Sequence, residues 1–436
     1  MANSIATSST VSLASHIERE AYSKVTWRLI PLLFVSYLVA YLDRVNVGFA
    51  KLQMLSDLNF SEATYGLGAG IFFVGYALFE VPSNIMLHRV GAKRWIARIM
   101  ITWGVLAATM MFVRTPTTFY ILRFLLGIAE AGFLPGIVLY LTYWYPAHRR
   151  GRVMALFFAA IPASGLVGGP LSGWIMESMA DTHGIAGWQW MFLLEAIPAI
   201  VLGCLVLILL PNRIHDASWL SIEEKQVLAT NMKADNQEKH DIPIRQIFTD
   251  KRILVLTGIY FFMAMGTYGI GFWLPSIIKA TGVASLFKIG LLTAIPFLSA
   301  IVGMLLFSRS ADTTGERKWH LAAAIMIGSI GMSLSVYFAS STTAALAALS
   351  IAAIGAYSSV PLFWALPTAF VSGVSAAAAI AFINSIANVA GFISPYMIGW
   401  IKQTSGSTNL AMLMLAVALF AGVLLTLTIP ARLVNK

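Results

Sequence analysis

Residues 27–50 read WRLIPLLFVSYLVAYLDRVNVGFA, an apolar run that carries two adjacent charges, Asp43 and Arg44, near its end. A helix of roughly 20 apolar residues is long enough to cross the hydrocarbon core of a bilayer, which is about 30 Å thick. A charged side chain at that depth costs about 2.5–3.5 kcal/mol on insertion scales, so we expect these charges to have a function. Arg123 and Glu130 interrupt a later apolar run in the same way.

The rest of the chain is similarly hydrophobic. Of its 436 residues, 58% are hydrophobic and 11% are charged, whereas soluble domains carry about 25% charged residues. The apolar runs are continuous rather than alternating, which favours helices over the strands of a membrane barrel. The sequence therefore predicts an all-α polytopic membrane protein of about twelve helices. They are expected near 27–50, 64–87, 94–113, 117–143, 152–177, 188–210, 252–279, 286–308, 319–339, 343–367, 372–400 and 409–431.

One long polar segment, at 211–251, divides the apolar runs into two sets of six. Within it, Ser221 is followed three residues later by Glu224, a capping-box pattern that predicts a helix on the membrane surface. The predicted organisation is a cytoplasmic tail at 1–26, a six-helix bundle at 27–210, a cytoplasmic linker at 211–251, a second six-helix bundle at 252–431 and a cytoplasmic tail at 432–436.

The net charge of +10 is explained by topology rather than by nucleic-acid binding. Basic residues cluster in alternate loops, and the intervening loops carry few of them. This positive-inside bias places both termini in the cytoplasm. The clusters are Arg89, Lys93, Arg94 and Arg98, then Arg149, Arg150 and Arg152, then Arg309, Arg317 and Lys318.

Two loops share one pattern, which suggests an internal repeat. NIMLHRVGAKR at 84–94 follows the second expected span, and SRSADTTGERK at 308–318 follows the eighth. Gly91 corresponds to Gly315, and a pair of basic residues follows each glycine at the same spacing. Glycine permits a tight turn, so both loops are expected to be tight cytoplasmic connections.

This repeated loop resembles the signature of the major facilitator superfamily, in which a glycine, an acid, a base, a glycine and two bases follow in order. The resemblance covers nearly the whole chain and implies two six-helix halves that face each other across a central cavity. The departures are Asn84 and His88 in the first copy and Ser308 and Thr313 in the second. The residues expected to form the gating loop motif are Arg89, Gly91, Lys93, Arg94, Asp312, Gly315 and Arg317.

Four further segments resemble the anion:cation symporter family, which contains permeases for D-galactonate, tartrate, phthalate and hydroxyphenylacetate. In its sugar-acid members, the acids that match Asp43 and Glu130 are thought to take the protons. The arginine that matches Arg44 holds a carboxylate of the substrate. The four segments are YLDRVNVGFA at 41–50, FEVPSN at 79–84, RFLLGIAEAGFLPG at 123–136 and GWQWMFLLEAIPA at 187–199.

Helix geometry suggests how the four charges are arranged. Asp43 and Arg44 are about 100° apart on a helix and cannot face each other. Arg123 and Glu130 are close to two turns apart and share a face. In the fold that the resemblance implies, the first and fourth spans both line the cavity, so we expect Asp43 to pair with Arg123, and Arg44 to lie nearer Glu130 and the cavity. Asp43, Glu130 and Arg123 are the predicted proton-coupling residues, and Arg44 is the predicted anchor because its planar guanidinium binds a carboxylate at two points.

This arrangement would link anion binding to protonation. Without substrate, Arg44 neutralises Glu130. An incoming carboxylate competes for Arg44 and leaves Glu130 unpaired, and an unpaired carboxylate in a low dielectric takes a proton. The alternative is a static network of buried salt bridges that fixes helix packing, although buried ion pairs contribute little net stability.

The other predicted substrate contacts are neutral, because the second half has almost no charge in its apolar runs. Tyr41 and Tyr76 lie on the first two spans and Trp364 on the tenth. Asn384 and Asn388 are four residues apart on the eleventh span and share a face. Simple packing is the alternative for the aromatic residues.

Other unusual residues in the spans are expected to be structural. Glu80, near the cytoplasmic end of the second span, is expected to join the basic loop residues, and Glu195 is expected to have a structural role. Gly127, Gly132 and Gly136 are expected to let helices pack closely.

The favoured function is import of a small organic carboxylate with protons, by alternating access across the inner membrane of a bacterium. The substrate is a hydroxy acid, such as tartrate or a sugar acid, or an aromatic acid. The carrier is expected to work as a monomer in the lipid bilayer, with no cofactor and no metal, and it is not expected to be an enzyme. A Gly-Pro motif at 164–173 keeps an exchanger or efflux carrier open as an alternative, and a transporter-like membrane sensor is a second one.

Overall fold

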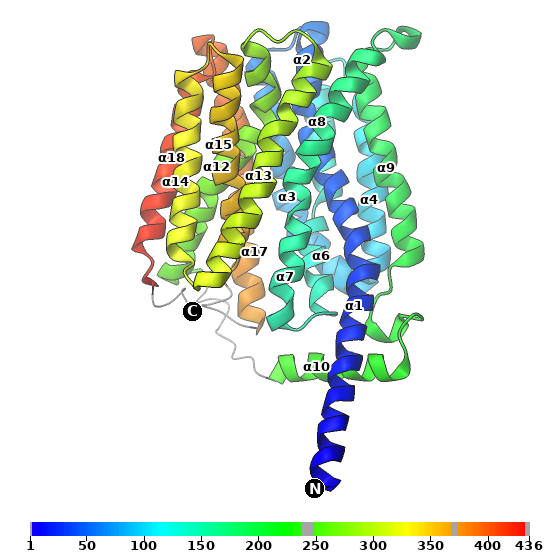
Figure 1. Ribbon diagram of the computed structural model, residues 1–436. Coiled ribbons are helices and arrows are strands. Elements are labelled where there is room, and N and C mark those ends of the chain that lie inside the picture. Colours follow the sequence, from blue (N-terminus) through cyan, green and yellow to red (C-terminus); the bar gives the residue numbers. More distant parts are fainter. Residues whose placement is uncertain (1, 238–247, 368–372, 432–436) are drawn as a thin grey trace.

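The computed structural model (Figure 1) describes residues 2–237, 248–367 and 373–431. The predicted tail at 432–436 and residues 238–247 of the predicted linker lie outside the described residues. Regular structure in the described part is helical, and twelve stretches of it are long and apolar enough to cross a membrane. The prediction of an all-α protein with about twelve membrane helices is therefore confirmed.

The first half is more finely divided than its six predicted spans. Breaks at Asn46, at Ala131 and Gly132, and at Ala159 split the first, fourth and fifth spans into two helices each. The helices are α1 (Ala2–Val45), α2 (Val47–Leu58), α3 (Glu62–Val90), α4 (Ala92–Thr109), α5 (Pro116–Glu130), α6 (Phe133–Thr142), α7 (Ala147–Phe158), α8 (Ala160–Ser178) and α9 (Gly187–Leu209).

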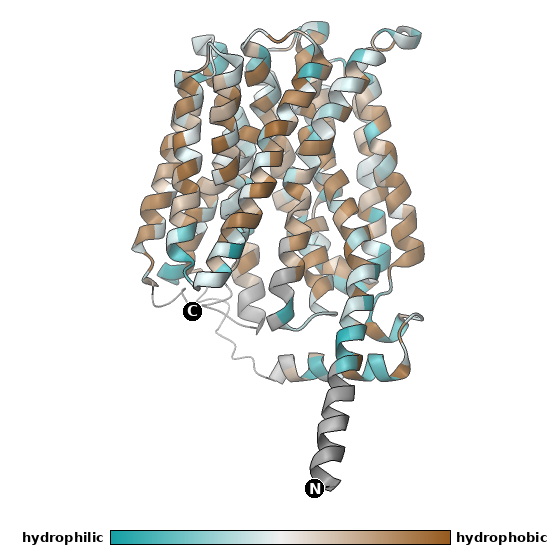
Figure 2. Cartoon of the chain, viewed as in Figure 1, coloured by the Kyte–Doolittle hydropathy of each residue, from teal (hydrophilic) through white to brown (hydrophobic). Residues whose placement is uncertain are grey.

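The second half follows the predicted spans more closely. Its helices are α12 (Lys251–Ala280), α13 (Leu286–Thr314), α14 (Lys318–Tyr337), α15 (Thr342–Trp364), α17 (Gly373–Ser405) and α18 (Asn409–Thr428). Both α3 and α13 run beyond the ends predicted for them, up to the glycine of each repeated loop. Figure 2 shows apolar residues along the helices of both halves and hydrophilic residues concentrated at α10 and the adjacent ends of the bundle.

The break between α5 and α6 depends on Gly132. Its φ of 83° lies in the left-handed region that favours glycine. A Cβ atom at this position would lie 2.3 Å from the Ser83 hydroxyl oxygen of α3. The glycine was predicted to serve packing, and it also turns the backbone, so Glu130 becomes the last residue of its helix.

The repeated loops are tight turns, as predicted. Gly91 has φ 95° between α3 and α4, and Gly315 has φ 68° after α13. The turn at Gly91 is held by the Lys93 backbone N–H, which donates to the Asn212 side-chain oxygen at 3.0 Å. The gating role assigned to these loops stays a prediction.

The polar segment between the halves contains α10 (Ile222–Gln237), which lies across the end of the bundle beside α1 (Figure 1). The predicted capping box is present: the Glu224 N–H donates to Ser221 Oγ at 3.2 Å, and the Ser221 N–H donates to Glu224 Oε2 at 2.8 Å. Lys24 of α1 donates to Glu224 Oε1 at 2.6 Å. Burial opposes the charge of Glu224, but the bonds from Lys24 and Ser221 outweigh it and lower its pKa.

The two halves pack through α3 against α17 and through α8 against α13. Glycines allow the second contact, since a Cβ on Gly290 would lie 2.3 Å from the Gly169 carbonyl oxygen. At the end of the bundle remote from α10, one carboxylate joins the halves. Glu62 of α3 contacts Lys402 of α17 and Lys51 of α2, each at 2.6 Å.

Lys51 is almost fully buried among these contacts. Its Nζ lies 3.3 Å from the centroid of the Trp273 ring of α12 and 4.8 Å from that of the Tyr65 ring of α3. Cation–π contacts of this kind stabilise a charge that is shielded from water. We call Lys51, Glu62 and Lys402 the external cluster.

The close packing of α14 against α15 allows a test of the fold. A Cβ on Gly355 would lie 2.0 Å from the Gly328 backbone nitrogen. Overpacking of this kind costs about 1–3 kcal/mol, so Gly355→Val should lower the thermal stability of the purified protein and its monodisperse yield. Ala347→Val, on the exposed face of the same helix, is the matched control and should leave both unchanged.

Candidate functional site

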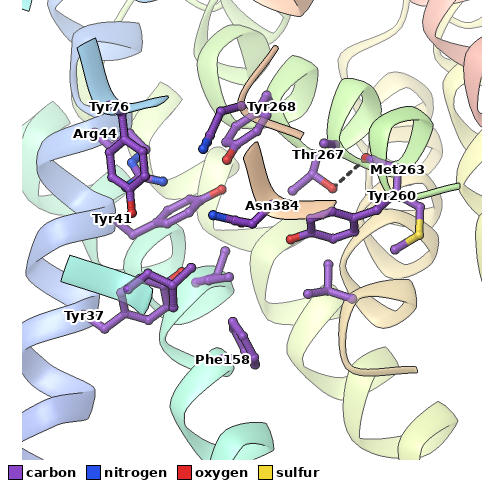
Figure 3. Close-up of a pocket in the computed structure, with 15 residues that line it drawn as sticks. Tyr37, Tyr41, Arg44, Tyr76, Phe158, Tyr260, Met263, Thr267, Tyr268 and Asn384 are labelled. Carbon is purple, nitrogen blue, oxygen red and sulfur yellow. Dashed lines mark hydrogen bonds between the residues drawn. The ribbon is translucent and has the colours of Figure 1, made fainter. Parts of the chain in front are cut away.

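A cavity lies between the halves, near the middle of the membrane-spanning helices (Figure 3). Its water-accessible volume is about 40 Å³. A single water needs about 10–15 Å³, so the cavity has room for a few waters. The lining residues are Tyr37, Tyr41, Arg44, Tyr76, Leu134, Phe158, Ile161, Tyr260, Met263, Ala264, Thr267, Tyr268, Val360, Asn384 and Asn388.

Arg44 is the charged residue of this lining. It lies in the last turn of α1, two residues before the break at Asn46, and is 5% exposed. Its Nη2 donates to Glu130 Oε1, and the two side chains form a buried ion pair. The predicted proximity of Arg44 to Glu130 is therefore confirmed. The break at Gly132 places the carboxylate at the end of α5, where it reaches the guanidinium from a neighbouring helix.

Aromatic rings surround the Arg44 guanidinium. Its Cζ lies 5.2 Å from the ring centroids of Phe72 and Tyr76, and 5.5 Å from that of Tyr41. The Tyr268 hydroxyl also lies close to it. Figure 3 shows the Tyr76 ring against Arg44. The rings exclude water and hold the cation in place, so a carboxylate that reaches Arg44 meets a desolvated, fixed guanidinium.

Arg123 does not pair with Asp43, and this prediction was wrong. Its Nε donates to the Gly68 carbonyl oxygen at 3.2 Å and its Nη2 to the Ala69 carbonyl oxygen at 3.4 Å, both in α3. A Cβ atom at position 68 would overlap the Phe119 ring of α5, so glycine there lets α5 pack closely against α3. Arg123 therefore fastens α5 to α3, and its predicted part in proton coupling stays a prediction.

Asp43 points instead to α4. Its Oδ2 accepts a hydrogen bond from the indole N–H of Trp103 at 2.9 Å. Its Oδ1 is buried and has no hydrogen-bond partner among the described residues. The proton-coupling role assigned to Asp43 stays a prediction.

Glu195 lies behind Asp43 and outside the cavity lining. It accepts hydrogen bonds from Ser172 Oγ at 2.6 Å and from Asn46 Nδ2 at 3.0 Å. These bonds connect α9 to α8 and to the break between α1 and α2. The contacts agree with the structural role expected for it.

Glu80 does not join the basic loops, so that expectation was wrong. It is buried at the contact of α3 with α17, where Asn384 Nδ2 donates to its Oε1 at 2.7 Å and Asn388 Nδ2 donates to its Oε2 at 3.0 Å. Both asparagines line the cavity as predicted. Glu80 faces inward because it lies one helical turn after Tyr76, on the same face of α3.

Trp364, a predicted substrate contact, stands one layer behind the cavity. It packs on Tyr260, with ring centroids 4.9 Å apart, and Tyr260 forms the wall. Sequence reasoning missed Tyr37 and Tyr260 as lining residues. Helical spacing could have found them, since Tyr37, Tyr41 and Arg44 recur every three or four residues, as do Tyr260, Met263, Ala264, Thr267 and Tyr268.

Similar proteins are transporters. The chain is 50% identical over 423 residues to "Putative metabolite transport protein NicT" of Pseudomonas putida, covering 97% of each protein. It is 47% identical to "Putative tartrate transporter" of Agrobacterium vitis, over 95% of this chain and 92% of that one. It is 41% identical to "Quinolone resistance transporter" of Acinetobacter baumannii, over 95% of this chain and 96% of that one.

The fold is shared with a solved structure of low sequence similarity. A bacterial homologue of the human lysosomal transporter Spinster, in an inward-facing and occupied conformation, superposes with a TM-score of 0.70 at 15% identity and covers 92% of this chain and 95% of its own. Residues 33–395 match the family described as the Major Facilitator Superfamily. The chain is therefore a multi-pass membrane transporter, not an enzyme, and it belongs to the major facilitator superfamily.

Proposed function

We propose that the protein imports a small organic carboxylate together with protons, by alternating access. The observation that carries this proposal is the buried pair of Arg44 and Glu130 at the wall of the central cavity. Arg44 supplies the fixed positive charge that a carboxylate requires, and Glu130 is the group that this carboxylate displaces. The similarity to a relative named for tartrate supports an organic acid as the substrate.

Coupling follows from the balance of charge in a site without bulk water. An arginine does not lose its proton in proteins, so Arg44 always needs an anion beside it. When a substrate carboxylate takes that place, Glu130 loses its partner, and burial then favours its protonated form. Asp43, with one unsatisfied oxygen, is the second proposed proton acceptor. Arg123 donates hydrogen bonds to two backbone carbonyl oxygens of α3 and is proposed to hold α5 in register against α3.

The proposed location is the inner membrane of a bacterium, with both termini in the cytoplasm. The start of α1, the end of α18 and α10 lie at the same end of the bundle (Figure 1). The basic loops at Gly91 and Gly315 belong to that end as well, in agreement with the positive-inside bias. The carrier is also proposed to work as a monomer.

A second candidate is an exchanger or efflux carrier. The similarity to a quinolone resistance transporter favours it, as does the Gly-Pro step at Gly169 and Pro170, inside α8 at its contact with α13. An exchanger needs no net proton movement, because one bound anion replaces another at Arg44. It therefore predicts that internal anion accelerates uptake.

Uptake into proteoliposomes separates these candidates. An imposed inward proton gradient should drive accumulation of at least one acid from a panel of labelled tartrate, D-galactonate, phthalate and 4-hydroxyphenylacetate. A protonophore should collapse that accumulation, because the gradient is the energy source. Flux that is insensitive to the protonophore but increases with internal anion would contradict symport and support exchange.

Arg44→Ala should weaken carboxylate binding by about 10- to 100-fold, since a hydrogen bond to a charged group contributes about 1.5–3 kcal/mol. Binding is measured on purified protein in detergent, where no gradient acts. Arg44→Lys keeps the charge but not the planar fork, so its affinity should fall between those of Arg44→Ala and the wild type. Equal affinity in all three proteins would remove Arg44 as the anchor.

Glu130→Gln should abolish proton-driven accumulation and preserve exchange of labelled for unlabelled acid, because glutamine cannot take up the coupling proton. Counterflow in the absence of a gradient provides the internal control that the variant is folded and binds substrate. Full accumulation by Glu130→Gln under the proton gradient would exclude Glu130 from coupling.

A further inference from the structure

The coupling scheme above makes no use of Glu80, although it is a buried carboxyl at the central contact between the halves. It is 2% exposed. It belongs to α3 of the first half, and both of its hydrogen-bond donors, Asn384 and Asn388, belong to α17 of the second. The two amides form part of the cavity wall, and Glu80 lies behind them.

An ionised Glu80 fixes which way both amides point. A carboxylate only accepts hydrogen bonds, so each asparagine must turn its NH₂ group toward it. The amide oxygens are left on the other side of each side chain, and no donor among the described residues reaches them. Figure 3 shows Asn384 projecting among the tyrosine rings of the cavity. This wall therefore offers acceptors, which suit the hydroxyl groups of a ligand.

The charges near Glu80 give the cavity two unlike poles. Arg44 of α1 faces it, together with the hydroxyls of Tyr76 on α3 and of Tyr260 and Tyr268 on α12. Tyrosine hydroxyls can donate or accept, so they do not set the polarity of the wall. Arg44 makes one pole positive, while Glu80 and the two amide oxygens make the other negative.

We propose that Glu80 is a positioning residue that sets substrate specificity at the pole opposite Arg44, an inference that rests on the proposed transport of carboxylates. With Glu80 ionised, the site prefers an acid with one carboxylate and several hydroxyls over the same acid with a second carboxylate. The first carboxylate binds Arg44, and the hydroxyls donate to the oxygens of Asn384 and Asn388. A second carboxylate would meet acceptors and a negative charge.

Protonation of Glu80 relaxes this preference. A protonated carboxyl can donate a hydrogen bond, so one asparagine is free to turn and present its NH₂ group to the cavity. The repulsion between Glu80 and a second carboxylate disappears at the same time. The penalty against a dicarboxylate should therefore shrink as pH falls.

The test compares D-galactonate with galactarate, which share the hydroxyls at C2 to C5 and differ at C6, a primary alcohol in galactonate and a carboxylate in galactarate. Affinities are measured on the full-length protein in detergent at pH 8 and pH 5.5, where both acids stay ionised. The ratio of the two affinities cancels effects of pH on Arg44, Glu130 and Asp43 that both ligands share. For wild type, the preference for galactonate should be about tenfold or more at pH 8, the scale of one hydrogen bond to a charged group, and smaller at pH 5.5.

Glu80→Gln should bring the ratio near one and make it independent of pH, because glutamine carries no charge and can donate. Glu80→Asp retains the carboxylate and should retain a pH-dependent preference. Glu195→Gln is the matched control, since Glu195 is also a buried carboxyl with two hydrogen bonds, but neither of its donors, Ser172 and Asn46, lines the cavity. It should keep the wild-type ratio.

The outcomes separate the two proposals. A wild-type protein that binds organic acids, with the same ratio and pH dependence in Glu80→Gln, overturns the role of Glu80 and leaves the proposed function standing. A wild-type protein that binds no acid of the panel overturns the proposed function and this inference with it. Loss of the preference in Glu80→Gln and in Glu195→Gln alike would assign the effect to packing and would also overturn the role of Glu80.

Discussion

A permanent positive charge in a place without bulk water is the constraint on which the site depends. Arg44 keeps its proton at any physiological pH, and the aromatic rings around it leave little room for solvent. The protein must therefore supply an anion whenever the substrate is absent. Glu130 fills that need, and it can do so because the chain breaks at Gly132 and ends α5 at the carboxylate. The helix break at Gly132, the packing of the aromatic rings and the ion pair with Glu130 all stabilise the positive charge of Arg44.

The two halves contribute different chemistry to the cavity. Both halves line the cavity with tyrosines, but its charged residue, Arg44, belongs to the first half and its amides, Asn384 and Asn388, belong to the second. The contact of Glu80 with Asn384 and Asn388 connects the two kinds of wall. In the proposed alternating access, movement of one half against the other changes the surroundings of this carboxyl.

Hydropathy alone was sufficient to predict the number of membrane helices, because a bilayer demands long continuous apolar runs. The proximity of Arg44 and Glu130 could also be predicted from the sequence, since both charges needed a partner and their helices were expected to line one cavity. The helix breaks could not be predicted, because a run stays apolar whether or not it bends at Asn46 or Gly132. The partners of Arg123 and Glu80 depend on helix rotation, which spacing within one span does not reveal. Glu80 and Asn384 are 304 residues apart in the chain.

The external cluster has a consequence for how an anion first meets the protein. It combines two lysines with one glutamate, so its formal charge is +1 where the halves meet at the end remote from α10. When the halves separate there, Lys402 leaves Glu62, and Lys51 leaves the Trp273 ring that shields it. The mouth of the open pathway then displays an unbalanced cation to the medium. Such a field draws anions toward the opening from about a Debye length away, which is about 8 Å at physiological ionic strength. With this end facing outward, as proposed, capture of the substrate from outside should slow as salt concentration rises, even though the binding site itself is buried beyond the reach of that screening.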